Sequence, residues 1–200
     1  MEPARPPKPI SWSLDKALLL AMSDRFQNVK CLKDKTLVTI FLIALATGSR
    51  ISELQALLRT VESIVFSDNG VTLYPNPNFL AENEDPVLRR SPLFISSLEN
   101  EEGSPHLLCP VAMLKSYLQL SSATKYFKLF VNPLDLSDLS LAKLRLYLCS
   151  FIRTADPGSV PLSHDLRKVA SSFAFFIQCP LNKLKELLVE SLVDSSGNII

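Results

Sequence analysis

The feature that most constrains the fold of this chain is an apolar run that ends in Thr-Gly and is followed at once by an arginine. The run extends from Leu37 to Ala46 and is apolar nearly all round, so we expect a helix at the centre of the core. Gly48 suits the C-cap of that helix, where a left-handed backbone would strain any residue with a Cβ. A second amphipathic helix begins at Ile51, so Arg50 lies at a sharp corner between two buried helices.

A second basic motif opens a later helix. Ser163 is the expected N-cap, and His164 and Arg167 follow three residues apart, hence on one face of that helix. Two arginines and a histidine on separate rigid helices suit a phosphodiester, because each guanidinium can bind two phosphate oxygens and the imidazole can donate or accept a proton. Taken alone, Arg50 would be interpreted as a surface arginine that pairs with Glu53. The second motif favours a shared site instead.

These motifs resemble the two arginine boxes of the tyrosine recombinases, also called the phage integrase family. Thr-Gly-Ser-Arg-Ile-Ser-Glu-Leu, residues 47–54, is similar to the first box, and His-Asp-Leu-Arg, residues 164–167, is similar to the second box, His-x-x-Arg. Segments 79–83, 108–111 and 129–131 also resemble the recombinases of DIRS-type retroelements. The resemblance covers about residues 10 to 176 and implies a catalytic-domain fold that is mainly helical with one small antiparallel sheet.

The resemblance further implies a metal-free and cofactor-free reaction at a DNA phosphate. In this family a tyrosine attacks the phosphate, two arginines neutralise the charge on its non-bridging oxygens, and a histidine assists proton movement. The residues of this chain that match these catalytic positions are Arg50, His164 and Arg167. The expected DNA-binding residues are Arg50, Arg89, Arg90, Arg167 and Lys168.

Two positions depart from the family pattern. The lysine that protonates the leaving oxygen in DIRS-type recombinases falls where this chain has Glu82, which cannot act as a cationic acid, and the nearby arginines hold their protons too firmly to replace it. No tyrosine, histidine or tryptophan follows Arg167 among these 200 residues. The tyrosines, which all precede the second box, are Tyr74, Tyr117, Tyr126 and Tyr147. Because the covalent intermediate needs a nucleophile, we expect this chain to be inactive in strand cleavage.

The clearest strand signal is a hairpin around Asp68-Asn69-Gly70. Asn-Gly is typical of tight hairpin turns, where it supplies positive φ angles. We therefore expect strands at Ser63–Ser67, Val71–Pro75 and Leu93–Ser96. Further helices are expected at Leu14–Met22, Pro110–Ser121, Leu139–Ala155, His164–Gln178 and Asn182–Val193.

The domain organisation that we expect has four parts. Residues 1–10 form a disordered proline-rich arm, and residues 11–35 form a linker or the remnant of an N-terminal DNA-clamping domain. Residues 36–194 form the recombinase-like domain, and residues 195–200 form a frayed tail.

Composition leaves a second function open. A net charge of +1 is low for a DNA-binding protein, which normally has a strong positive field. The alternative is therefore a non-catalytic helical module, derived from a mobile element, that binds DNA or other proteins. The expected partner is DNA, with self-association on DNA left open, and no membrane or small-molecule cofactor is expected.

The cysteine pattern and the apolar segments predict the compartment. The four cysteines include no Cys-x-x-Cys pair, and the chain has only two histidines, so a zinc site is not expected. Scattered cysteines in apolar sequence are typical of a reducing compartment. The longest apolar run is too short to span a bilayer. We expect a soluble intracellular protein, nuclear if the source is a eukaryote.

Overall fold

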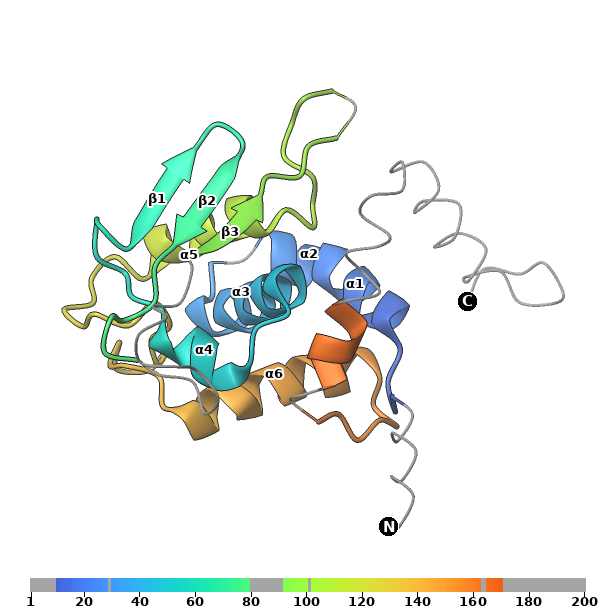
Figure 1. Cartoon of the computed structure of the whole chain (residues 1–200). Coiled ribbons are helices and arrows are strands. Elements are labelled where there is room, and N and C mark those ends of the chain that lie inside the picture. Colours follow the sequence, from blue (N-terminus) through green and yellow to red (C-terminus); the bar gives the residue numbers. More distant parts are fainter. Residues whose placement is uncertain (1–9, 29, 80–91, 101, 163–164, 171–200) are drawn as a thin grey trace, which may run out of the picture.

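The computed structural model describes residues 10–28, 30–79, 92–100, 102–162 and 165–170. Within these residues the protein is mainly helical with one small antiparallel sheet, which confirms the expected fold class. Figure 1 shows α3 at the centre, with the sheet on one side and α6 on the other. Residues 165–170 are also helical. The other elements are α1 (Leu14–Met22), α2 (Asp24–Gln27), α3 (Leu32–Thr47), α4 (Ile51–Ala56), β1 (Ile64–Ser67), β2 (Gly70–Leu73), β3 (Leu93–Ser96), α5 (Pro110–Leu120) and α6 (Leu141–Ala155).

Helix α3 is the central helix of the core, as the apolar run predicts. All of its residues from Lys35 to Leu45 are buried, and it packs against α5 and β3 on one side and α6 on the other. Gly48 ends it with a φ of 60°, and the Gly48 amide donates a hydrogen bond to the carbonyl oxygen of Ala44 at 2.9 Å. The predicted glycine C-cap is confirmed.

Three aromatic rings connect α3 to α6 and α2. Phe151 of α6 stacks on Phe41 of α3 with a centroid distance of 4.6 Å, and it meets the edge of Phe26 of α2 at 5.2 Å. Trp12 and Leu18 are buried in the same core. Residues 12–27 therefore pack with the domain core, while the origin of residues 11–35 and the other domain boundaries stay predictions. Residues 1–9 of the predicted arm and the whole predicted tail, residues 195–200, lie outside the described residues.

The sheet has the order β1-β2-β3 with antiparallel pairing throughout. One face covers the core through Val71, Leu73 and Ile95, which are all buried. The other face carries a cross-strand row of Val65, Thr72 and Phe94, of which Val65 and Phe94 are exposed.

The hairpin turn differs from the prediction in its backbone conformation. The hairpin forms where it is predicted, but Asp68, Asn69 and Gly70 have no positive φ angle, so the expected positive φ angles of an Asn-Gly turn are wrong. Gly70 already belongs to β2, where it pairs with both neighbouring strands. A Cβ at Gly70 would lie far inside contact distance of the Ile95 carbonyl oxygen and 3.0 Å from the ring of Phe94. The glycine is therefore required by the close approach of β3.

We expect Gly70→Ala to lower the free energy of unfolding by about 3 kcal/mol, the upper end of the range for overpacking, because a backbone carbonyl must move. Urea unfolding measures this change. Gly158→Ala is the matched control, since a Cβ there would meet nothing within 4 Å. The control should change stability by less than about 0.5 kcal/mol. Equal effects in the two variants would contradict the close approach.

Candidate functional site

The corner between α3 and α4 fixes the backbone of Arg50. Arg50 is the N-cap of α4, and its amide donates a hydrogen bond to Oε2 of Glu53 at 2.7 Å. A guanidinium cannot accept a hydrogen bond, so only the half of a capping box in which Glu53 is the acceptor forms. Glu53 is buried and Arg50 is exposed. The Arg50 guanidinium makes no hydrogen bond or ion pair with any residue that the structure describes, so the interpretation of Arg50 as the ion-pair partner of Glu53 is not supported.

Helix 165–170 begins with the same kind of interaction. Asp165 is buried, and its Oδ2 accepts a hydrogen bond from the amide of Leu162 at 3.1 Å. Its Oδ1 accepts a hydrogen bond from Nζ of Lys168 at 3.4 Å. Arg167 and Lys168 are exposed on this helix. In both motifs a buried carboxylate accepts a hydrogen bond from a backbone amide at the start of a helix. An exposed arginine lies close to this carboxylate in the sequence.

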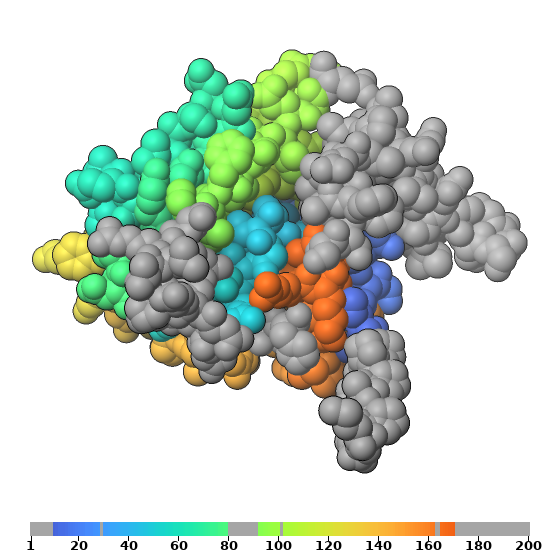
Figure 2. Space-filling model, viewed as in Figure 1, coloured from blue at the N-terminus to red at the C-terminus, as the bar shows by residue number. Residues whose placement is uncertain are grey.

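The two motifs meet at Gly48 and Ala170. A Cβ placed on Gly48 would lie 3.6 Å from the Cβ of Ala170, which is ordinary van der Waals contact. Figure 2 shows the corner after α3 in cyan beside helix 165–170 in orange, on one face of the molecule. Arg50 follows Gly48 by two residues and Arg167 precedes Ala170 by about one helical turn. The backbones of both arginines therefore lie near this contact, which we call the arginine junction.

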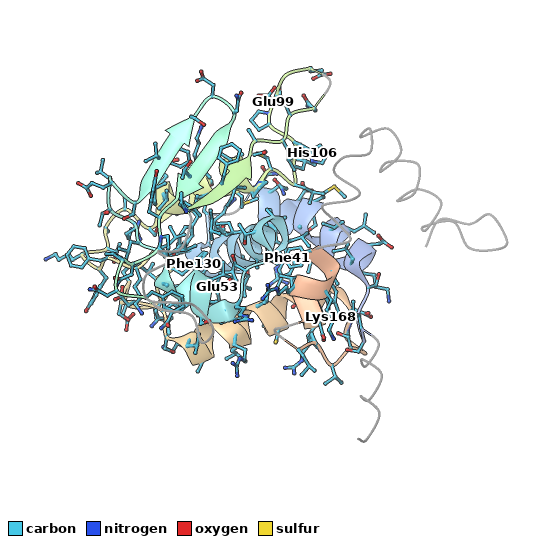
Figure 3. The ribbon with its side chains drawn as sticks, viewed as in Figure 1. Phe41, Glu53, Glu99, His106, Phe130 and Lys168 are labelled. Atoms are coloured by element: carbon cyan, nitrogen blue, oxygen red, sulfur yellow. The ribbon has the colours of Figure 1, made fainter. Side chains whose placement is uncertain are left out.

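The other predicted site residues fall partly inside and partly outside the described chain. Lys168 is on helix 165–170, as Figure 3 shows, and pairs with Asp165. His164, Arg89, Arg90 and Glu82 lie outside the described residues. The catalytic and DNA-binding assignments of all these residues stay predictions.

Sequence reasoning missed the buried hydroxyl of Ser49. Ser49 lies between Gly48 and Arg50 and is only 8% exposed. Within the described part of the chain, its Oγ has no hydrogen-bond partner. A buried hydroxyl without a hydrogen-bond partner lowers the stability of the fold. The Ser49 hydroxyl is therefore a group at the junction that could still form a hydrogen bond. Its one signal in the sequence is its place between the C-cap glycine and the N-cap arginine.

Helix α6 adds positive charge next to α4. It packs against α1, α3 and α4, and its sequence contains no acidic residue. Lys143, Arg145 and Arg153 are exposed on it. Although the chain as a whole is almost neutral, this surface is basic.

The tyrosines differ widely in accessibility. Tyr117 is fully buried, and its hydroxyl donates to the carbonyl oxygen of Leu129 at 3.2 Å and accepts from the amide of Val131 at 2.9 Å. Burial raises the pKa of Tyr117 to about 12, so this residue is a poor nucleophile. Tyr74 and Tyr126 are exposed. Tyr147 is half-buried, and desolvation raises its pKa above the ordinary value.

The described residues contain neither a cluster of metal ligands nor a membrane-spanning helix. No group of three or more histidine, cysteine, aspartate or glutamate side chains among them could hold a metal ion. No helix in this part of the chain is both long enough and apolar enough to cross a membrane.

Comparison with known proteins gives a likeness in fold and none in sequence family. No protein-family model matches the chain, and no curated protein matches it. The fold is similar to that of a structure described as the crystal structure of XerA recombinase, a tyrosine recombinase, with a TM-score of 0.54 and 18% sequence identity. The likeness covers 92% of this chain and 56% of that chain, so the chain spans little more than half the length of this relative. At this identity the likeness concerns the fold alone, and the resemblance to DIRS-type recombinases stays a prediction.

Proposed function

We propose that this chain is a DNA-binding domain of recombinase type, related to the DIRS-type retroelement recombinases. The domain would bind a backbone phosphate of the DNA at the arginine junction. The observation that carries the proposal is the packing of Gly48 against Ala170, where a Cβ placed on Gly48 would lie 3.6 Å from the Cβ of Ala170. This packing brings the two arginine motifs together from distant parts of the chain. Arg50 and Arg167 are exposed there and can each bind two oxygens of one phosphate. His164 would be the third residue of this site, since Arg50, His164 and Arg167 match the catalytic positions of the family that the chain resembles.

Outside the junction, the proposed interface is electrostatic. Lys168, Arg89 and Arg90 would contact neighbouring phosphates, as would the basic surface of α6. Contacts of this kind hold DNA in register without reading its sequence. The net charge of +1 makes the overall field weak, so we expect modest affinity that depends on these few groups.

We also propose that these 200 residues bind DNA without cutting it. Cleavage needs an attacking oxygen in line with the leaving 5′-oxygen, and no tyrosine follows Arg167 to supply it. Glu82, in place of the family's lysine, adds to the deficit because an acidic side chain cannot protonate the leaving oxygen as a cation would.

The test is DNA affinity measured over a salt series. Three to five phosphate contacts predict a slope of roughly −3 to −5 in a plot of log K against log salt concentration. A nicked suicide substrate should give no covalent protein–DNA adduct on a denaturing gel. An absent or salt-independent affinity would contradict DNA binding. An adduct mapped to any of the four tyrosines would contradict the proposed inactivity.

The second candidate is a protein-interaction module derived from a mobile element. The observation that favours it is a set of exposed apolar side chains, including Val61 at 88% and Phe127 at 69% exposure, together with the low net charge. Unchanged DNA affinity after loss of both junction arginines would favour this candidate.

A further inference from the structure

A cavity lies between α2, the N-terminal part of α3, the first half of α5 and the segment 105–109. Its volume is about 180 Å³, and its lining includes Gln27, Lys35, His106, Ala112 and Ser116. Figure 3 labels His106 on the segment between β3 and α5. The cavity has room for several water molecules or one small organic molecule. None of these residues belongs to the arginine junction, so a ligand in this cavity would bind independently of the proposed DNA contacts.

Lys35 is the only charged residue in the described lining of the cavity, and it is 2% exposed. Its Nζ donates to the carbonyl oxygens of Phe26 at 3.4 Å and Gln27 at 3.3 Å, which are both long hydrogen bonds. An ammonium group has three N–H donors, so the described residues leave one of them without an acceptor. Desolvation lowers the pKa of Lys35 below its ordinary value, and a buried cation without a counter-ion costs free energy.

Other polar groups lie around the cavity. Nδ1 of His106 accepts a hydrogen bond from the amide of Leu108 at 3.1 Å, which fixes the ring against this segment. Ser116 contributes a hydroxyl to the lining. Gln27 is held in place because its Nε2 donates to the carbonyl oxygens of Ala21 and Leu107 at 2.6 and 2.9 Å.

The remaining walls indicate the kind of anion. Pro105, Leu107 and Met113 also line the cavity, and none of the described residues in its lining is acidic. One buried cation suits a monoanion better than a phosphate dianion, and apolar walls suit a short hydrocarbon chain. We propose that this cavity binds a small monocarboxylate, with Lys35 as its counter-ion and Ser116 as a hydrogen-bond donor.

The experiment is an NMR titration of the full chain with butyrate as the probe. The amide signals of Leu108 and Ala112 should shift to saturation with a dissociation constant on the order of 1 mM. Chloride at matched ionic strength should give no saturable shift, and phosphate should bind at least about 10-fold more weakly than butyrate. A lack of saturation with butyrate would overturn the proposal, and phosphate binding as tight as butyrate would overturn the choice of monocarboxylate.

Two variants locate the binding. Lys35→Met should weaken butyrate binding by about 10-fold or more, because the counter-ion is lost while the side-chain length is kept. Lys33→Met is the matched control, an exposed lysine on the same helix that should leave binding unchanged. Ser116→Leu should block the cavity while it keeps Lys35, and so tests the site even if Lys35→Met fails to fold. Undiminished binding in Ser116→Leu would place butyrate elsewhere.

Discussion

Replacement of both arginines at the junction, in Arg50→Ala/Arg167→Ala, is expected to weaken DNA binding about 100-fold. A hydrogen bond to a charged partner contributes about 1.5–3 kcal/mol, so two lost contacts remove at least about 3 kcal/mol. Both side chains are exposed, so their truncation removes no core packing. Phosphate contacts carry no base information, and the loss should therefore be the same for all DNA sequences. The slope of the salt plot should also become shallower by roughly one unit, because both arginines contact the same phosphate.

The control for this experiment is a second double variant with the same change in net charge, Arg25→Ala/Lys33→Ala. Lys33 is exposed, and Arg25 forms an exposed ion pair with Asp34 at 3.2 Å, which should contribute little to stability. We expect DNA affinity to fall by less than about threefold in the control, because only the general field weakens. If both double variants lose affinity equally, DNA does not bind at the arginine junction.

The first half of the junction could be predicted from the sequence because its causes are local. An apolar run specifies a buried helix, and the glycine that follows specifies where it ends. The approach of Ala170 is not local, since it depends on how two distant helices pack. Spacing alone predicts that Arg167 and His164 share one face of a helix. Their residue types favour a shared site with Arg50, and the resemblance to a family supports that pairing.

Gly70 shows how a correct prediction can have the wrong cause. The Asn-Gly signal predicts the hairpin, and the strands lie within a residue or two of their expected bounds. The turn itself needs no positive φ, and the glycine is required by β3, which lies later in the chain. A local sequence pattern cannot reveal a requirement that comes from a neighbouring strand. Lys35 is a similar case, because nothing in its sequence context distinguishes it from the exposed Lys33.

Phe41→Ala is expected to lower the free energy of unfolding by about 4 kcal/mol, within the usual range for loss of a buried phenylalanine. Phe41 is completely buried in α3 and stacks on Phe151 at 4.6 Å, with 30° between the ring planes. Phe151 in turn contacts Phe26. The void left by the missing Phe41 ring would therefore loosen the contact of α3 with α6, and also the contact of α6 with α2. Chemical unfolding at equilibrium measures the loss as a lower midpoint with an unchanged slope.

Two comparisons test whether this stacked pair, rather than general hydrophobicity, holds the helices together. Phe127→Ala removes a phenylalanine that is 69% exposed and should change stability by no more than about 0.5 kcal/mol. A double-mutant cycle of Phe41→Leu and Phe151→Leu should give a coupling energy of about 0.5–1.5 kcal/mol, the range for aromatic pairs beyond simple burial. Zero coupling would mean that the rings merely fill space. A loss in Phe41→Ala as small as that in Phe127→Ala would contradict the position of α3 at the centre of the core, and with it the support for the corner that carries Arg50.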